Sequence, residues 1–197
     1  MRQLTAALLA LGCLLAGPAA GQSAQELLQA ERNETIVPRY LLQDPNGRSV
    51  TSEDFRGRFQ LIAFGYTYCP DICPTTLVEM AAVLKALGDR ATRLQPIFIT
   101  VDPERDSGPV LKKYTEFFDP RILGLTGSPA LVRRAADNFR IRYAKVGDPS
   151  ADPAHYAVDH SAGMILLGPD GRVVHKFAFA TPIDELSARI GELLGSR

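Results

Sequence analysis

Residues 59–74 read FQLIAFGYTYCPDICP, a nearly continuous apolar run that leads into two cysteines. An apolar run without alternation is typical of a strand that is covered on both faces of a sheet. We therefore predict a central strand at Phe59–Thr67, with Cys69 and Cys73 following at its carboxyl end. Ligand-binding and redox sites favour such edges of open sheets.

A helix is predicted directly after the cysteines, because apolar residues recur at helical spacing over residues 75–87 and Gly88 is a stop signal. Pro74 suits the first helical turn, where a missing N–H is no loss. If Cys73 lies in that turn, the exposed amides and the helix dipole favour its thiolate, the form that binds metal or attacks disulfides. The spacing of four also brings Cys69 and Cys73 to one side, which allows a disulfide or two ligands on one ion.

The rest of the chain alternates between strands and helices. Apolar runs bounded by turn residues predict further strands at residues 37–42, 49–51, 94–101, 165–167 and 173–179. Helical spacing of apolar residues predicts further helices at residues 110–118, 131–139 and 182–194. The first two strands flank the turn Asp44-Pro45-Asn46-Gly47 and form an N-terminal β-hairpin. This order of elements predicts a single α/β sandwich domain over residues 36–197.

Composition limits the class of protein. The 197 residues suffice for one ordinary domain with a sizeable core. Hydrophobic residues make up 46% and charged residues 22%, as in folded rather than disordered proteins. Lys plus Arg and Asp plus Glu number 22 each, so the charge balance favours neither a nucleic acid nor an anionic membrane surface as a partner. Three cysteines are too few for a disulfide scaffold, so the close pair points to chemistry.

The first 21 residues have the pattern of a signal peptide. Arg2 precedes an apolar stretch at residues 4–16, and small residues follow up to Gly21. The stretch is shorter than the roughly 20 residues that a transmembrane helix needs, so we predict cleavage near Gly21, with an uncleaved anchor as the alternative. Residues 22–35 are predicted to be a leader or linker. Export places the chain in the periplasm, free or anchored to the outer face of the inner membrane, where thiols oxidise readily.

If Cys69 and Cys73 bind a metal ion, we expect a third ligand from elsewhere in the chain. Two thiolates are soft ligands that suit Cu(I), for which imidazole is an acceptable partner. Of the three histidines, His155 lies in a polar stretch, His175 lies within a predicted strand and His160 lies just before a predicted core strand. Asp159 or a nearby backbone carbonyl could orient the His160 ring. The residues alone give His160 only a small preference over His155.

Three ordered segments then carry a resemblance. They are Gly65–Thr75 with both cysteines, Thr100–Asp106 (TVDPERD), and Val158–Ser161 (VDHS) followed by a Gly-Pro-Asp-Gly hairpin. Together they resemble the Sco (SenC) family of copper proteins, over roughly residues 36 to 194. The resemblance implies a thioredoxin-like fold with a central mixed β-sheet flanked by helices. It also implies that Cys69, Cys73 and His160 bind copper, as Cu(I), Cu(II) or both.

Members of that family deliver copper to the binuclear copper centre of cytochrome c oxidase. The resemblance therefore implies a metallochaperone rather than an enzyme. Its implied partners are the copper-site subunit of the oxidase and, beyond it, other copper chaperones or thiol-disulfide oxidoreductases. A disulfide between Cys69 and Cys73 would abolish copper binding and make metal loading depend on redox state.

The alternative is a thiol-disulfide oxidoreductase that keeps target cysteines reduced, such as those of the oxidase copper site. One cysteine of the pair would attack the target disulfide and the other would resolve the mixed disulfide. General thioredoxin activity is disfavoured by the CxxxC spacing, by the absence of Trp and by the absence of proline from residues 159–163. A peroxidase would need one activated cysteine with an arginine close by, which the sequence does not identify.

Two acidic features receive structural interpretations. The segment Asp102–Asp106 is interpreted as a loop in which an acid caps a helix near Pro109 and Arg105 pairs with a carboxylate. Asp71, between the two cysteines, is interpreted as a solvated loop acid and not as a ligand.

Overall fold

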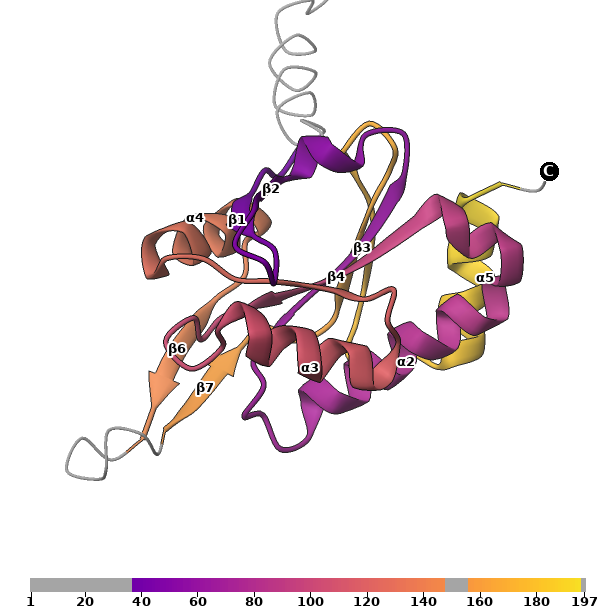
Figure 1. Ribbon diagram of the computed structural model, residues 1–197. Coiled ribbons are helices and arrows are strands. Elements are labelled where there is room, and N and C mark those ends of the chain that lie inside the picture. The colour runs from indigo at the N-terminus through magenta and orange to yellow at the C-terminus, as the bar shows by residue number, and fades with distance from the viewer. Residues whose placement is uncertain (1–36, 148–155, 196–197) are drawn as a thin grey trace, which may run out of the picture. The chain divides into compact units, whose positions relative to one another are not determined.

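Figure 1 shows a computed structural model of the chain, which describes residues 37–147 and 156–195. The predicted signal peptide at residues 1–21, the leader at residues 22–35, Cys13 and His155 lie outside these ranges. Within these ranges, every helix is too short or too polar to cross a membrane.

A five-stranded mixed sheet forms the centre of the domain, in the order β5-β4-β3-β8-β9 (Figure 1). β3 (Phe59–Gly65) pairs in parallel with β4 (Leu94–Thr100) and antiparallel with β8 (Met164–Leu167). β5 (Leu123–Leu125) runs parallel to β4, and β9 (Val173–Phe177) runs antiparallel to β8. Every residue of β3 is buried, which confirms the prediction of a strand covered on both faces.

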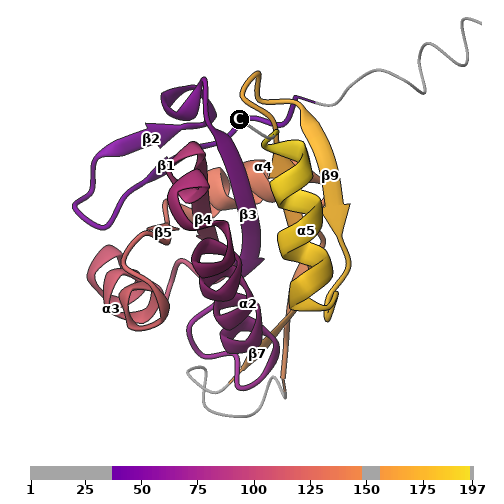
Figure 2. The same cartoon turned by 90° about the vertical axis from the view of Figure 1, so that its right-hand side faces the viewer.

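Helices cover both faces of this sheet. α2 (Ile72–Leu87) and α5 (Ile183–Leu193) pack against each other on one face, and Figure 2 shows them in front of β3. α4 (Pro129–Phe139) lies behind the sheet in that view, and α3 (Gly108–Phe118) packs against β5 and α2. α2 begins earlier than predicted, at Ile72, and this early start places Cys73 inside its first turn.

Smaller elements complete the domain. β1 (Leu41–Gln43) and β2 (Ser49–Thr51) form the predicted N-terminal hairpin. Two short 3-10 helices are η1 (Ser52–Phe55) and η2 (Gly88–Arg93). A second ribbon pairs β6 (Tyr143–Val146) antiparallel with β7 (Ala157–His160), and this ribbon was not predicted. Its strands lack an apolar run, since Val158 is their one buried residue.

The core lies between the sheet and the helices. Its largest fully buried side chains include members of β3, β4 and α2, namely Leu61, Ile62, Leu77, Met80, Leu84, Ile97, Phe98 and Ile99. Burying each such side chain contributes roughly 1.5–3 kcal/mol. This packing fixes the end of β3 relative to the start of α2, and the loop that joins them carries the cysteines.

Candidate metal centre

The loop between β3 and α2 carries both cysteines. Cys69 is half-buried in the loop, and Cys73 is buried at the second residue of α2. The Cys73 backbone N–H donates to Cys69 Sγ at 3.4 Å, and the Cys69 N–H donates to the carbonyl of Tyr66 at 3.3 Å. Both cysteines are free thiols. The spacing of four thus places the Cys69 sulfur against the first turn of α2, beside Cys73.

His160, at the end of β7, reaches this pair from 87 residues further along the chain. Its Nε2 lies 3.7 Å from Cys73 Sγ. Its Nδ1 lies 3.1 Å from the carbonyl oxygen of Val158. Because a carbonyl only accepts hydrogen bonds, the proton resides on Nδ1 and Nε2 turns its lone pair toward the thiol. A backbone carbonyl, and not Asp159, therefore orients the ring.

The distance between Cys73 Sγ and His160 Nε2 suits two ligands of one ion. At metal–sulfur and metal–nitrogen bonds of about 2.3 and 2.05 Å, the two ligand atoms lie about 3.6–3.8 Å apart for tetrahedral to trigonal angles. Across residues 37–147 and 156–195, no three His, Cys, Asp or Glu side chains are already gathered as a metal-binding group. Cys69 would complete a set of three by turning its sulfur away from the Cys73 N–H.

His175 does not share this position. His175 lies in β9, where its ring packs against that of Phe177 with 4.5 Å between centroids. His155 lies outside the described residues. The structure therefore brings His160, and not His175, to the cysteines.

Burial dominates the acidity of Cys73. Cys73 lies in the first helical turn as predicted, yet it is only 2% exposed. Burial raises the pKa of the Cys73 thiol far above its usual value, and a backbone hydrogen bond at Tyr66 only partly opposes this. The prediction that the helix start favours the thiolate is therefore wrong in this environment.

The loop between β4 and α3 ties the cysteine loop to the sheet. Asp106 is fully buried, and its carboxylate accepts hydrogen bonds from the Thr67 N–H at 3.0 Å, the Thr67 hydroxyl at 2.6 Å and the Thr100 hydroxyl at 2.7 Å. The prediction of a helix-capping acid is wrong, because Ser107 is the N-cap of α3 and Asp106 turns inward to these donors. Asp106 instead holds a residue that lies two positions before Cys69.

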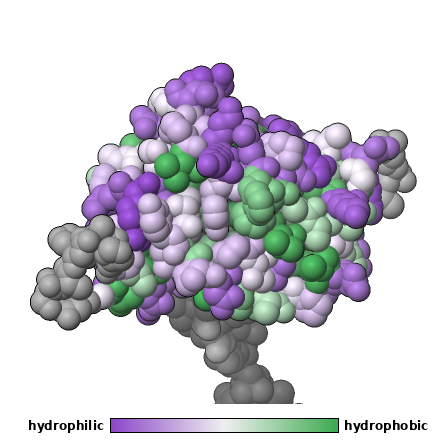
Figure 3. All heavy atoms as spheres, turned by 60° about the horizontal axis from the view of Figure 1, so that its bottom comes forward, coloured by the Kyte–Doolittle hydropathy of each residue, from purple (hydrophilic) through white to green (hydrophobic). Residues whose placement is uncertain are grey.

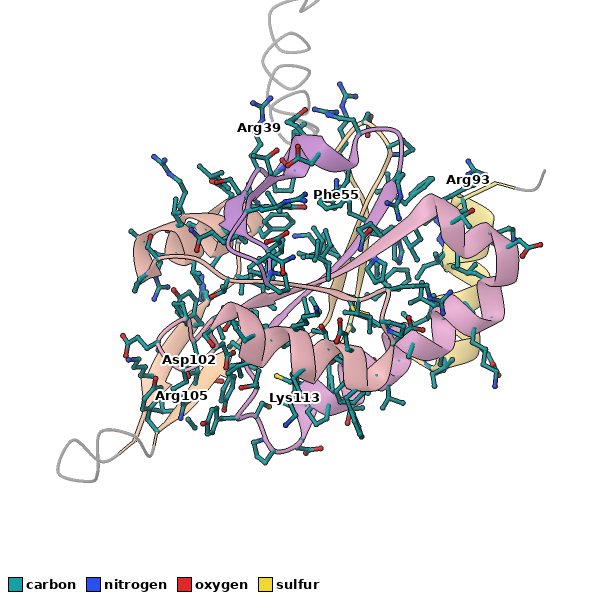
Figure 4. The ribbon with its side chains drawn as sticks, in the orientation of Figure 1. Arg39, Phe55, Arg93, Asp102, Arg105 and Lys113 are labelled. Atoms are coloured by element: carbon teal, nitrogen blue, oxygen red, sulfur yellow. The ribbon has the colours of Figure 1, made fainter. Side chains whose placement is uncertain are left out.

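Arg105 joins the cysteine loop to the strand of His160. The predicted pairing with a carboxylate is confirmed, since Arg105 forms an ion pair with Asp102. Its guanidinium also lies over the rings of Tyr156 and Tyr68, at 3.7 and 4.6 Å, and donates to the Tyr156 carbonyl at 3.1 Å. Figure 4 shows Asp102 and Arg105 beside β6 and β7.

Sequence reasoning did not identify Thr67, Tyr68 or Tyr156 as parts of the site. The sequence carried no signal for them, because the burial of Asp102 and Asp106, which makes polar partners necessary, is seen only in the structure. Asp71 is exposed, in agreement with its interpretation as a solvated acid. Figure 3 shows the face at the bottom of Figure 1, where apolar residues gather toward the middle and right and polar residues lie mostly around them.

Gly65 lies directly beneath Cys73, and this contact yields a prediction. A Cβ at Gly65 would lie 2.6 Å from Cys73 Sγ and 2.7 Å from the Phe98 ring. We expect Gly65→Ala to displace one of these groups and to lower the free energy of unfolding by about 1–3 kcal/mol in urea denaturation. Gly191→Ala is the control, because its Cβ meets only the flexible end of Arg90 and alanine favours the helix. Equal stability of the two variants would contradict the prediction.

Comparison with known proteins adds independent findings. The family model described as SCO1/SenC matches residues 28–195. The mitochondrial SCO2 homolog of Mus musculus is 38% identical over 178 residues, covering 86% of this chain and 69% of the mouse protein.

Two solved structures are similar in both sequence and fold. ScoI of Bradyrhizobium japonicum with copper bound is 39% identical, with a TM-score of 0.72, covering 80% of this chain and 99% of that chain. BsSco, in which a disulfide switch was identified, is a member of the Sco family of cytochrome c oxidase assembly proteins. It is 28% identical, with a TM-score of 0.62, covering 83% of this chain and 95% of that chain. These likenesses confirm the predicted thioredoxin-like α/β fold.

Proposed function

Because the chain belongs to the SCO1/SenC family, we propose that it is a copper metallochaperone. It binds one copper ion through the thiolates of Cys69 and Cys73 and through Nε2 of His160. It then delivers the ion to the binuclear copper site of cytochrome c oxidase. The copper bound to the Bradyrhizobium japonicum relative supports the choice of metal, and the oxidase assembly family of BsSco supports the destination.

One observation carries this proposal. Cys73 Sγ and His160 Nε2 are 3.7 Å apart although 87 residues separate them in the chain. The Val158 carbonyl keeps the Nε2 lone pair available, as a metal ligand requires. Two thiolates and one imidazole suit Cu(I) through the soft sulfurs and Cu(II) through the imidazole.

The arrangement also suits release of the ion. Copper is the cargo, and the two cysteines give up their protons when it binds. Cys69 is half-buried at the surface end of the site, beside the exposed ring of Tyr68. A thiolate of the receiving protein can therefore approach from this side and form its bond to copper as the bond to Cys69 breaks. Each ligand exchange transfers the ion without any redox step.

We place this activity outside the cytoplasm. The support is the signal-peptide pattern at residues 1–21, with its apolar stretch and small residues before Gln22. The protein acts in the periplasm, either free or anchored to the outer face of the inner membrane. The oxidase copper site that it serves must be reachable from that side.

Copper stoichiometry tests the proposal. The full chain, purified and reduced, is expected to bind about one Cu(I) per chain. The Cys69→Ser, Cys73→Ser double variant is expected to bind none. His175→Ala is the control, because it removes a side chain that could bind metal from β9, and it should bind as the unaltered chain does. Absence of copper from the unaltered chain would refute the metallochaperone.

The contact between Cys69 Sγ and the start of α2 supports a second candidate function, that of a thiol-disulfide oxidoreductase. The accessible Cys69 thiolate would attack a target disulfide and release one target thiolate. Cys73 would then attack the mixed disulfide, leaving a Cys69–Cys73 disulfide and a reduced target. A chain that binds no copper yet reduces a disulfide substrate would support this function in place of the first.

A further inference from the structure

The proposed ligands come from two separate parts of the fold. Cys69 and Cys73 lie at the end of β3 and the start of α2, whereas His160 lies on the β6–β7 ribbon. The ribbon pairs with itself and not with the central sheet, and most of its residues are exposed. A metal site needs its ligands held within about 0.5 Å of the geometry that binds. Contacts that fix the ribbon against the cysteine loop are therefore part of the site.

Arg105 lies between these two parts of the fold, beside the ribbon (Figure 4). Its guanidinium carbon is 4.6 Å from the ring centroid of Tyr68, the residue before Cys69. It is also 3.7 Å from the ring centroid of Tyr156, which directly precedes β7. A guanidinium within about 6 Å of an aromatic centroid is attracted to the face of the ring. Arg105 therefore contacts the cysteine loop and the ribbon of His160 at once.

A third ring extends this contact to His160 itself. The Tyr66 ring meets the His160 ring edge to face, with 5.8 Å between centroids, and the Arg105 guanidinium lies 5.7 Å from the Tyr66 centroid. The Tyr66 carbonyl also accepts the hydrogen bond from the Cys69 N–H at 3.3 Å. Tyr66 thus contacts two of the proposed ligand residues beneath the guanidinium.

The central sheet fixes the position of Arg105. Its side chain is largely buried and forms an ion pair with Asp102, which is fully buried just after β4. The Asp102 N–H donates to the Thr100 hydroxyl at 2.9 Å, and the Asp102 carboxylate accepts from the Tyr156 hydroxyl at 2.6 Å. Arg105 in turn donates to the Tyr156 carbonyl at 3.1 Å. One buried ion pair thus holds Tyr156 by its ring, its hydroxyl and its carbonyl.

Lys145 of β6 is a second link between the ribbon and the β4–α3 loop, but a weaker one. Its Nζ lies 4.5 Å from the centroid of Tyr156 and 2.7 Å from the Glu104 carboxylate. Both members of this ion pair are about half exposed, and exposed ion pairs contribute little. Neither of these contacts involves the cysteine loop, so they cannot set the place of Cys69.

We infer that Arg105 is a positioning residue of the proposed copper site, which sets the place of Cys69 relative to His160. This inference rests on the proposed function and deepens it. A planar guanidinium can lie over aromatic rings and donate to a carbonyl at the same time, whereas a lysine ammonium is a compact point charge without that shape. Cu(II) binding should be the most sensitive to this placement, because it depends more on the imidazole.

Arg105→Lys tests the inference, because it keeps a positive charge beside Asp102 and removes the planar fork. Without copper, the backbone amides of residues 66–69 and 156–160 should exchange hydrogen several-fold faster. With copper, the Cu(II) affinity should fall about 10-fold, as expected when a group that orients a ligand is lost. The Cu(II) charge-transfer band should change as well, which a loss of stability alone would not cause.

Arg133→Lys is the matched control. The Arg133 guanidinium also lies over a ring of the ribbon, that of Tyr143 at 3.6 Å, and donates to the Tyr143 carbonyl at 3.4 Å, but it comes from α4. This replacement should leave the exchange of residues 66–69, the Cu(II) affinity and the Cu(II) band unchanged. Equal effects of the two replacements would overturn the inference, because any loosening of the ribbon would then suffice.

Tyr68 offers a second test on a side chain that is mostly exposed. Tyr68→Phe keeps the ring and should bind Cu(II) within about 2-fold of the unaltered chain, whereas Tyr68→Leu should lose about 10-fold. Equal affinities of these two variants, or unchanged hydrogen exchange in Arg105→Lys, would overturn the inference and leave the metallochaperone intact. Absence of copper from the unaltered chain would instead overturn the metallochaperone.

Discussion

His160→Ala is expected to lower the Cu(II) affinity of the reduced protein by more than about 100-fold. Loss of a residue that merely orients a metal ligand typically costs about 10–100-fold in affinity, and loss of the ligand itself costs more. Among the described residues the one other histidine, His175, packs against Phe177 in β9. Cu(I) affinity should fall less, since two thiolates alone suit the softer ion whereas Cu(II) depends more on the imidazole.

Competition titration with a copper chelator, carried out for each oxidation state, measures this effect. His175→Ala is the matched control, and it should bind both ions as the unaltered chain does. His160→Ala lacks the imidazole that is proposed to bind copper. If this variant keeps full Cu(II) affinity, the third ligand lies elsewhere. His155, the histidine that sequence reasoning left open, would then be tested next.

Asp106→Ala should reduce the free energy of unfolding by about 3–5 kcal/mol, the range of the largest single-residue effects. The carboxylate is fully buried and accepts three hydrogen bonds, two from Thr67 and one from Thr100. Its removal leaves three donors without a partner, the buried Thr100 hydroxyl and the two partly buried donors of Thr67. Each donor then lacks the hydrogen bond that replaced its contact with water. The Thr67 backbone is then released, so copper affinity should fall as well.

Urea denaturation of the variant measures the stability, and copper titration measures the second effect. Glu116→Ala is the control, because Glu116 forms only an exposed ion pair with Lys112 and its loss should change stability by less than about 1 kcal/mol. Asp106→Asn, which keeps shape and one acceptor oxygen, should lose less than Asp106→Ala. Equal and small losses in both Asp106 variants would contradict the role assigned to the carboxylate.

The parts of the fold that the sequence predicted well are those with strong local patterns. β3 is a buried apolar run, and α2 has helical spacing and a proline in its first turn, so neighbouring residues determine both. The β6–β7 ribbon was missed because its strands are short and mostly exposed. Its position depends on distant partners, among them the Arg105 side chain that stacks on Tyr156.

In the candidate site, too, local features could be predicted from the sequence and features that depend on distant contacts could not. The pairing of Cys69 with Cys73 follows from their spacing, whereas the choice of His160 over His155 rested on resemblance, because contact across 87 residues is a tertiary property. The acidity of Cys73 was predicted in the wrong direction, since the helix start is visible in the sequence and the burial of the sulfur is not.

If the third ligand comes from a separate ribbon, as proposed for His160, copper loading should affect how long the protein survives in the cell. A chain in which β7 has not yet docked lacks His160 beside the cysteines, so copper would bind the finished fold in preference to incomplete ones. A ligand that binds the native state alone stabilises it in proportion to the logarithm of ligand concentration over Kd. Loaded molecules should therefore resist proteolysis better than empty ones. Copper starvation would then lower the abundance of the protein as well as its cargo.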